Sequence, residues 1–411
     1  MSESFDRMWA DLESIGRAPS GGYRRFAWTR EDHTLREWFA EQAAARGLDL
    51  TQDRVGNQWA WWGDPDEAVR AGRPGIATGS HLDSVPDGGA YDGPLGVISA
   101  FAAIDALRAA GVEPQRPIAV VNFVDEEGAR FGVACGGSRV LTGAMTAERA
   151  LGLRDDAGVT MAEALALAGQ DTAYFGADPE ALGRVGSFIE LHVEQGRGLI
   201  DVDSPIGVAS DIWPHGRWRI DLPGEANHAG STRMQDRQDA MVSLAELVLA
   251  ARDLALKHSS VATVGKIAIE PGGVNAIASH ATAWLDSRGP LEPPVRALVD
   301  EVQVLVERLG GRMAQESWTA PTPFDEALST RLRGVITGHH HTVPVLGSGA
   351  GHDAGILASA GIPTAMLFVR NPTGISHSPA EFAEPADCRV GVEALAACLT
   401  DLVGPQGEVD R

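Results

Sequence analysis

The stretch from Gly79 to Gly93, GSHLDSVPDGGAYDG, carries His81, Asp83 and Asp92 directly after a short apolar run. In an α/β protein, a buried parallel strand passes its chain to the active-site edge of the sheet at such a point. Imidazole and carboxylate groups together suit zinc, manganese or a related divalent ion. Taken alone, the stretch fits an ordinary polar loop as well. Residues later in the chain favour the metal site.

Similar residues follow other predicted strands. The apolar run 117–124, PIAVVNFV, leads into Glu126 and Glu127, and a further strand-like run, FIELHVEQG, contains His192. His377 comes after a predicted strand at 364–369. Because the carboxyl ends of parallel strands meet at one edge of a sheet, we expect these side chains to converge. The candidate metal ligands are His81, Asp92, Glu127, His192 and His377.

This set could hold two divalent ions that share one carboxylate, as in two-metal hydrolases. Asp92 is the natural bridge if His81 and His192 bind one ion while Glu127 and His377 bind the other. Any one of these residues could instead be a surface or capping residue. The set favours a metal site because its residue types agree with one another and with the topology.

Two further carboxylates could assist the chemistry. Glu126 adjoins Glu127, so one of them can face a metal while the other faces a bound water. A free carboxylate there is a candidate general base that later acts as the general acid. Glu126 could equally be a helix N-terminal carboxylate that the helix dipole favours. Asp83 lies two residues from His81 and could orient its ring.

The order of predicted elements changes after residue 212. Strand, helix, two strands, helix and strand follow at 217–222, 236–258, 261–270, 281–287, 294–309 and 312–318. This βαββαβ order is that of a ferredoxin-like unit. We therefore expect an α/β metal-binding catalytic domain, with a mixed sheet flanked by helices, at 1–212 and 324–411. An inserted ferredoxin-like domain is expected at 213–323, with the Pro-rich segment TAPTP as its exit.

The inserted segment carries polar residues that could bind a substrate. His228 could donate a hydrogen bond to an oxyanion. Asn275 and Arg288 are suited to grip a carboxylate, since the guanidinium offers a bidentate fork. On spacing alone, turn and strand-end roles are just as compatible with these residues.

Composition narrows the class of protein. The chain has 411 residues and a formal net charge of -22, which argues against nucleic acid or anionic membrane partners. No apolar run reaches the roughly 18 residues of a membrane span. The three cysteines are widely spaced, and the first residues lack a signal-peptide pattern, so we expect a cytoplasmic protein.

Together these motifs resemble the hydantoinase/carbamoylase branch of the M20 metallopeptidase-like amidohydrolases. That branch includes N-carbamoyl-L-amino acid hydrolases, β-ureidopropionases and allantoate amidohydrolases. The short spacing from His81 to Asp92 and the stretch LHVEQG resemble this branch more than the peptidases. The matching residues are His81-x-Asp83 with Asp92, Glu126–Glu127, His192-x-Glu194-Gln195-Gly196, Asn227-His228-Ala229-Gly230, Asn275, Arg288, Gly351-His352-Asp353-Ala354 and Ser376-His377-Ser378-Pro379-x-Glu381.

The resemblance implies a ureido-cleaving enzyme with two divalent metal ions per subunit (zinc, manganese, cobalt or nickel). Glu126 would be the general base, His228 would stabilise the oxyanion, and ammonia and carbon dioxide would be released. The branch is typically a homodimer through the inserted domain, which would also close over the site as a lid. Substrate contacts are implied for Gln195, His215, His228, Asn275, Arg288 and Gly351.

The sequence leaves open the roles of three residues and the activity itself. The position of His215 is often Gln in relatives, Arg370 varies among them, and His352 fits a hydrogen-bonded structural role better than a catalytic one. The substrate could be an N-carbamoyl amino acid or allantoate. An M20-type peptidase or N-acyl amino acid deacylase is the alternative activity, and a metal-free binding protein is a further alternative.

Overall fold

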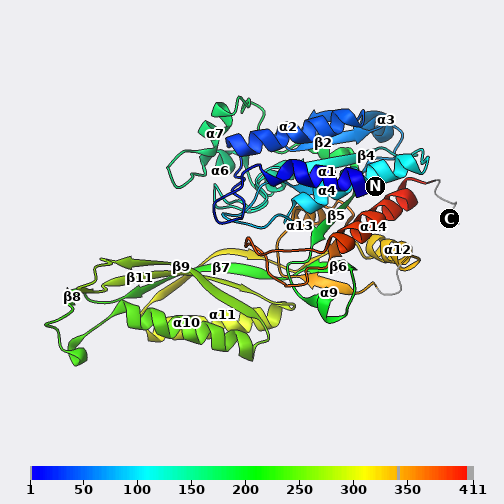
Figure 1. Cartoon of the computed structure of the whole chain (residues 1–411). Coiled ribbons are helices and arrows are strands. Elements are labelled where there is room, and N and C mark those ends of the chain that lie inside the picture. Colours follow the sequence, from blue (N-terminus) through cyan, green and yellow to red (C-terminus); the bar gives the residue numbers. More distant parts are fainter. Residues whose placement is uncertain (1, 340–342, 405–411) are drawn as a thin grey trace. The chain divides into compact units, whose positions relative to one another are not determined.

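The computed structural model describes residues 2–339 and 343–404 (Figure 1). The chain forms two compact units, a large unit of Met1–Ser210 and Pro323–Arg411 and a small unit of Asp211–Thr322. The outermost parts of the predicted catalytic domain, residue 1 and 405–411, lie outside the described residues. Each unit has its own sheet and its own apolar core.

The large unit is built on a nine-stranded mixed sheet in the order β1-β2-β4-β3-β5-β15-β6-β13, with β14 paired to β6. The four central strands β4, β3, β5 and β15 are parallel, and their partners β2 and β6 run antiparallel. This confirms the expected mixed α/β sheet. The strands are β1 (Asp49–Gln52), β2 (Gln58–Trp62), β3 (Gly75–His81), β4 (Ile118–Phe123), β5 (Val185–Val193), β6 (Ile206–Ile212), β13 (Thr322–Pro323), β14 (Val345–Ser348) and β15 (Thr364–Val369).

Helices cover both faces of this sheet. The helix α4 (Pro94–Ala109) is almost wholly buried, so its sequence is apolar all round instead of striped. It packs in one apolar cluster with α1 (Ser2–Glu13), α2 (Arg30–Ala45), α12 (Glu326–Thr337) and α14 (Pro385–Val403). The opposite face carries α5 (Gly136–Leu141) and α13 (Asp353–Ser359). The shorter helices are α3 (Pro65–Arg70), α6 (Ala147–Gly152), α7 (Met161–Leu167), α8 (Pro179–Gly183) and α9 (Gly198–Asp201).

The strand order reverses between β3 and β5. From β3 the chain crosses through α4 to β4 on one side of β3, and it later returns to β5 on the other side. Ligands of open α/β sheets bind at such a switch point, outside the carboxyl ends of the strands. The ends of β3 and β5 are therefore where a ligand is expected in this fold.

The sequence from Thr51 to Trp62 alternates between apolar and polar residues, which predicts one strand. That prediction is wrong, because the run is not continuous but forms the hairpin of β1 and β2. Between these strands, the carboxylate of Asp53 accepts hydrogen bonds from the backbone N–H groups of Val55, Gly56 and Asn57. An aspartate that bonds the backbone ahead of it closes a turn, and this local chemistry outweighs the alternating pattern.

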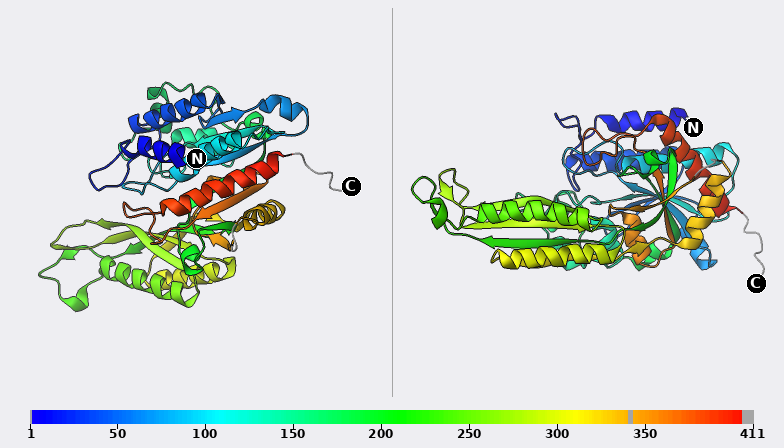
Figure 2. Two further views of the ribbon diagram at one scale, coloured as in Figure 1. Left: turned by 45° about the vertical axis from the view of Figure 1, so that its right-hand side comes forward. Right: turned by 90° about the horizontal axis from the view of Figure 1, so that it is seen from below.

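The small unit has a four-stranded antiparallel sheet in the order β12-β7-β11-β9, with two helices against one face. In β7, inward residues such as Trp218, Ile220 and Leu222 are buried, while alternate residues are not. Viewed from below, α10 and α11 run side by side along this unit (Figure 2). Its elements are β7 (His215–Pro223), β8 (Asn227–His228), η1 (Met234–Asp236), α10 (Ala240–Lys257), β9 (Val261–Glu270), β10 (Ala276–Ile277), β11 (His280–Arg288), α11 (Glu292–Arg308) and β12 (Arg312–Thr319).

Among residues 2–339 and 343–404, no helix combines the length and the apolar character that crossing a membrane requires. The longest helix there, α14, spans 19 residues and carries charged side chains.

Because α4 is mostly buried, shortening one of its apolar side chains should destabilise the folded protein. Leu107 is 1% exposed in the core of the large unit, so Leu107→Ala should lower the free energy of unfolding by about 2–5 kcal/mol. Leu167 is 85% exposed, and Leu167→Ala is the matched control, with an expected change below about 0.5 kcal/mol. Urea-induced unfolding measures both. Equal effects of the two substitutions would contradict the packing described for α4.

Candidate active site

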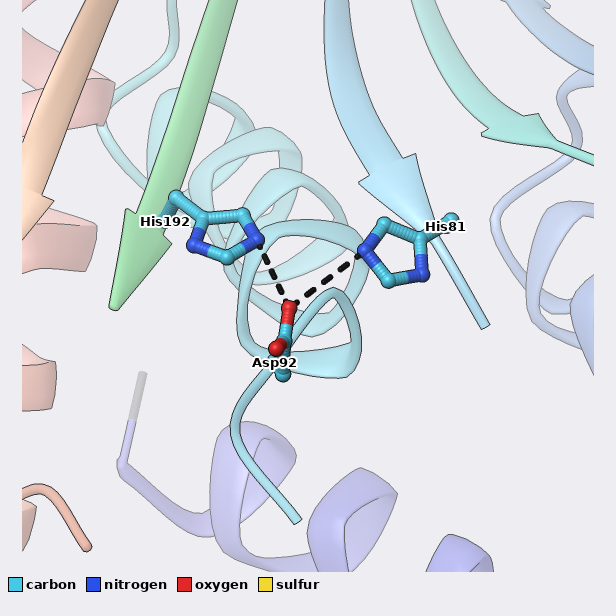
Figure 3. A group of neighbouring side chains, drawn as sticks. All are labelled: His81, Asp92 and His192. Atoms are coloured by element: carbon cyan, nitrogen blue, oxygen red, sulfur yellow. Dashed lines mark ion pairs between the residues drawn. The ribbon is translucent and has the colours of Figure 1, made fainter. Parts of the chain in front are cut away.

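The first group of metal-competent side chains lies at the switch point (Figure 3). His81 ends β3, His192 lies near the end of β5, and Asp92 comes from the loop that leads into α4. Asp92 Oδ1 is 3.2 Å from His192 Nε2 and 3.6 Å from His81 Nε2. All three residues are buried. The two imidazoles and the carboxylate therefore point at one small volume.

A second group shares Asp92. His377 Nε2 lies 3.4 Å from Asp92 Oδ2 and 3.7 Å from Glu127 Oε2. His377 is in the loop after β15 and has a φ of 54°. This left-handed conformation is unfavourable for a residue with a side chain and is typical of functional sites. The two oxygens of Asp92 thus face different groups, which is the arrangement expected for a bridging ligand.

Two ring nitrogens of the first group lack partners. His81 Nε2 and His192 Nε2 are buried and have no hydrogen bond among the described residues. The other nitrogen of each ring is bonded, His81 Nδ1 to the carbonyl of Asp83 at 3.1 Å and His192 Nδ1 to the carbonyl of Val193 at 2.9 Å. Donation from Nδ1 leaves a lone pair on Nε2. Both lone pairs point toward Asp92, so the donor set fits a divalent cation.

The buried carboxylates of this site have shifted pKa values, and the shifts differ in direction. Burial raises the pKa of Glu126 well above its usual range, and burial together with the Asp92 carboxylate does the same for Glu127. Burial also raises the pKa of Asp92, but the adjacent imidazoles of His192 and His81 outweigh it and hold that pKa well below the usual range. Crowded carboxylates in a buried place favour a bound divalent cation, because its charge stabilises their ionised forms.

Asp83 contacts the ring of His81 mainly through its backbone. Its backbone carbonyl, not primarily its side chain, bonds the ring of His81; the nearer carboxylate oxygen is 3.5 Å from Nδ1. The carboxylate instead accepts hydrogen bonds from the backbone N–H groups of Glu126 and Glu127, at 3.1 and 3.0 Å. Asp83 therefore holds the loop that presents the glutamate pair.

Glu126 lies beside the first group. Its Oε2 is 3.7 Å from His81 Nε2, and its Oε1 accepts a hydrogen bond from the thiol of Cys135 at 3.4 Å. The residue before it, Asp125, has a φ of 57°, which turns the chain sharply after β4. A buried carboxylate with a raised pKa can accept a proton from a nearby water.

Sequence reasoning missed two residues that shape this site. Gly93 follows Asp92 with a φ of 83°, and a Cβ there would lie 2.4 Å from the ring of His81. Only glycine therefore lets the imidazole approach the loop. Glu381 accepts hydrogen bonds from the backbone N–H of Asp92 and from Ser376 Oγ. The motif around His377 contained Glu381 but gave no indication of its partners.

Gln195 donates a hydrogen bond to the carboxylate that both groups share. Its Nε2 donates to Asp92 Oδ2 at 2.9 Å and to Ser376 Oγ at 3.1 Å. Its Oε1 is buried and has no hydrogen bond among the described residues. The amide is therefore held from one side and offers an acceptor on the other.

The predicted substrate residues of the small unit fall into two pairs. His228 and Asn275 are close together, since β8 pairs with β10 and Ala229 N donates to the carbonyl of Asn275. His215 and Arg288 are directly opposite each other on β7 and β11. These pairs lie at opposite ends of the sheet, because the end of β7 nearest β8 pairs with the first residue of β11.

The remaining singled-out residues have local partners. The buried His352 bonds Ser348 Oγ through Nε2 at 3.2 Å, and its ring lies 4.6 Å from that of His192. Burial, with the charge of His192, holds the pKa of His352 well below its usual range. Arg370 pairs with Asp387 and Asp203, which is a structural role. Gly351 is exposed next to His352.

Comparisons with known proteins agree with this site. The sequence pattern of Peptidase family M20/M25/M40 matches residues 77–401, which is most of the chain. An N-carbamoyl-L-amino acid amidohydrolase of Geobacillus stearothermophilus is 34% identical over 98% of this chain and 99% of its own length. Allantoate amidohydrolase of Escherichia coli is 31% identical, with 95% of both chains covered.

A solved structure extends the likeness to three dimensions. The hydantoinase/carbamoylase family amidase of Burkholderia vietnamiensis superimposes with a TM-score of 0.86 at 31% identity, over 98% of this chain and 97% of that chain. Similarity of sequence and of fold over nearly the whole length excludes a chance match of motifs. The chain therefore belongs to peptidase family M20/M25/M40 and, within it, to the hydantoinase/carbamoylase branch of hydrolases that act on carbon–nitrogen bonds.

Proposed function

We propose that this hydrolase cleaves the ureido group of an N-carbamoyl amino acid or a related ureido acid. The observation that carries the proposal is the pair of donor groups that share Asp92, with the buried carboxylate of Glu126 beside them. The Geobacillus relative is named for N-carbamoyl-L-amino acids and the Escherichia coli relative for allantoate. Both kinds of compound contain a ureido group and a carboxylate, so one site chemistry serves either.

The proposed metal ligands are those of the two groups. His81, Asp92 and His192 would hold one divalent ion, and Asp92, Glu127 and His377 would hold the other. Nitrogen and oxygen ligands without thiolate suit zinc, manganese, cobalt or nickel. When bound, such ions supply Lewis-acid activation of water and of a carbonyl oxygen. We further propose a cytoplasmic location, because the three cysteines are buried free thiols, which suit a reducing compartment.

Glu126 is proposed to move the proton. It takes a proton from water as the water oxygen bonds to the ureido carbonyl carbon. The bond from that carbon to the amino acid nitrogen then breaks, and Glu126 returns the proton to this nitrogen. The products are the free amino acid and a carbamate, which decomposes to ammonia and carbon dioxide. The hydrogen bond from Cys135 keeps the carboxylate in place for both transfers.

The substrate contacts follow from hydrogen-bonding capacity. His228 Nδ1 accepts from the backbone N–H groups of Gly230 and Ser231, so the proton of the neutral ring is on Nε2, ready to donate to an oxyanion. The unpartnered Oε1 of Gln195 suits the N–H groups of a ureido substrate. Arg288 is oriented by a bidentate pair with Asp286 and is proposed to bind the substrate carboxylate. His215, Asn275 and Gly351 complete the proposed contacts.

A homodimer is proposed because the two pairs of the small unit are far apart. His228 and Asn275 are separated from His215 and Arg288 by the length of the nine-residue strand β11, which is about 26 Å at roughly 3.3 Å per residue. A small ureido acid cannot reach both pairs in one protomer. We propose that one pair serves its own subunit and the other pair serves the partner's site, with the small unit acting as a lid.

The dimer surface is proposed along α10 and the edge strand β9. Val242, Leu249 and Leu256 are exposed at seven-residue intervals on one stripe of α10, and Val261 and Ile267 are exposed on β9. An apolar stripe beside an unpaired strand edge favours association of two copies. The two-fold symmetry of such a dimer presents the same edge on both partners.

The class of substrate can be tested directly. Chelator-stripped protein is reloaded with zinc or manganese and offered N-carbamoyl-L-amino acids, N-carbamoyl-β-alanine and allantoate, with an N-acetyl amino acid and a dipeptide for comparison. We expect ammonia from at least one ureido acid and its loss on adding chelator. Release of free amine from only the N-acetyl compound or the dipeptide would instead identify a deacylase or a peptidase.

Glu126→Gln should separate proton transfer from metal binding. Because a positioned general base contributes about 10²–10⁴ in rate, kcat should fall at least about a hundredfold. Zinc binding by calorimetry should stay unchanged, since Glu126 is in neither donor group. The matched control is Glu113→Gln, an exposed residue away from the site. Near-full activity of Glu126→Gln would dismiss the proposed base.

The shared site can be tested with mixed dimers. Arg288→Ala and His228→Ala protomers are co-expressed with different tags, and the heterodimer is isolated on both tags. If the pairs come from two protomers, one site of the heterodimer is intact and its activity is about half that of wild type. Each variant homodimer should be at least tenfold less active. A heterodimer as weak as the homodimers would show that both residues act in the same protomer's site.

A further inference from the structure

Glu381 joins the two loops that bear the shared and the most exposed of the proposed ligands. It lies after β15, four residues beyond His377, and is 4% exposed. Its Oε1 accepts hydrogen bonds from the backbone N–H groups of Tyr91 and Asp92, at 3.1 and 3.0 Å. One carboxylate oxygen therefore fixes the backbone at the position of the bridging ligand.

The other oxygen of Glu381 reaches the Asp92 side chain through a serine. Ser376 Oγ donates to Glu381 Oε2 at 2.9 Å and lies 3.5 Å from Asp92 Oδ2. Gln195 Nε2 donates to both Ser376 Oγ and Asp92 Oδ2. The carboxylate of Asp92 is thus held on the side that faces His377, which leaves Oδ1 toward the two strand histidines.

The facing loop is shaped to receive Glu381. A Cβ on Gly89 would lie 2.4 Å from Glu381 Oε1 and 2.5 Å from Glu381 Cβ, so only glycine admits the side chain. The rings of Tyr91 and Phe382 meet edge to face at 5.9 Å and close the contact next to it. A close-packed carboxylate that accepts three hydrogen bonds and is 4% exposed is a fixed part of the site.

We propose that Glu381 is a positioning residue that sets the spacing between the two metal positions, and this inference rests on the proposed function. His81 and His192 extend from strands and need no such support. His377 belongs to a loop, with a side chain 53% exposed, and shares its metal position with Asp92. Loss of Glu381 should therefore weaken metal binding by Asp92, Glu127 and His377 more than metal binding at the strand histidines.

Zinc titration of the stripped protein tests this role without any substrate. Wild type should bind two equivalents by calorimetry. Glu381→Ala should bind the weaker equivalent at least tenfold less tightly, because removal of an outer-shell partner costs about 10–100-fold in metal affinity. The affinity for the tighter equivalent of zinc should change by a smaller factor. Ser376→Ala, which leaves the two backbone bonds intact, should weaken the same equivalent.

Glu381→Gln is the rescue variant. Its amide oxygen can accept both backbone N–H groups, and its NH₂ group can donate to Ser376 Oγ, whose hydroxyl can then donate to Asp92. The second equivalent should stay within about threefold of wild type, given that these bonds are kept. Glu384→Gln and Glu384→Ala, at an exposed residue three positions away, are the matched controls and should bind zinc as wild type does.

The outcomes separate the two proposals. Two wild-type equivalents that remain unchanged in both Glu381→Ala and Ser376→Ala would overturn the role of Glu381 and leave the metal centre intact. Fewer than two equivalents in wild type would overturn the metal centre, and the role of Glu381 with it. Thermal unfolding of the metal-free variants is measured alongside. A lower Tm with unchanged zinc affinity would reduce Glu381 to a purely structural residue.

Discussion

Burial of the Asp92 carboxylate is the constraint on which the rest of this structure depends. Asp92 is 6% exposed. Burial of an ionised carboxylate destabilises the folded state by several kcal/mol unless opposite charge or hydrogen bonds compensate for the lost hydration. Here the two imidazoles, the amide of Gln195 and the backbone held by Glu381 surround it on different sides. These partners come from different segments of the chain. The strand ends that carry them must therefore lie close to Asp92.

The fold meets this requirement with rigid elements where precision matters. His81 and His192 extend from adjacent parallel strands at the point where the strand order reverses, and Asp92 enters between them on the loop before α4. The helix α4, which is buried along most of its length, anchors that loop from behind. Rotamers locked by packing and outer hydrogen bonds keep donor atoms aimed at one point, which is what metal binding requires. The glutamate pair is placed in the same way through Asp83.

The small unit follows a different design. Its sheet buries one face beneath α10 and α11 and leaves polar residues at its two ends, and none of its residues belongs to either proposed donor group. Under the proposed function, the large unit would carry the chemistry and the small unit would carry substrate contacts. Such a division would allow substrate preference to change through residues such as His215 and Arg288 without a change in the proposed metal ligands.

Much of this organisation could be predicted from residue order alone. The apolar runs at 75–78, 117–124 and 364–369 correspond to β3, β4 and β15, since a strand buried on both faces reads as a continuous apolar run. The side chains that converge at their ends were also identifiable, because imidazoles and carboxylates after such runs have few structural duties. The hairpin of β1 and β2 was missed because the turn at Asp53 interrupts an alternating pattern that spacing cannot distinguish from one strand.

What the sequence by itself determined is thus the set of reactive groups and the strands that carry them. Only the tertiary structure decided how those groups are supported. Glu381 accepts a hydrogen bond from Asp92, which is 289 residues away in the chain, and Asp83 accepts one from Glu126, which is 43 residues away. Gly93 has no side chain that would clash with the ring of His81. The reason is physical: local pattern reports burial and periodicity, whereas hydrogen-bond partners and close approaches depend on how distant loops are packed together.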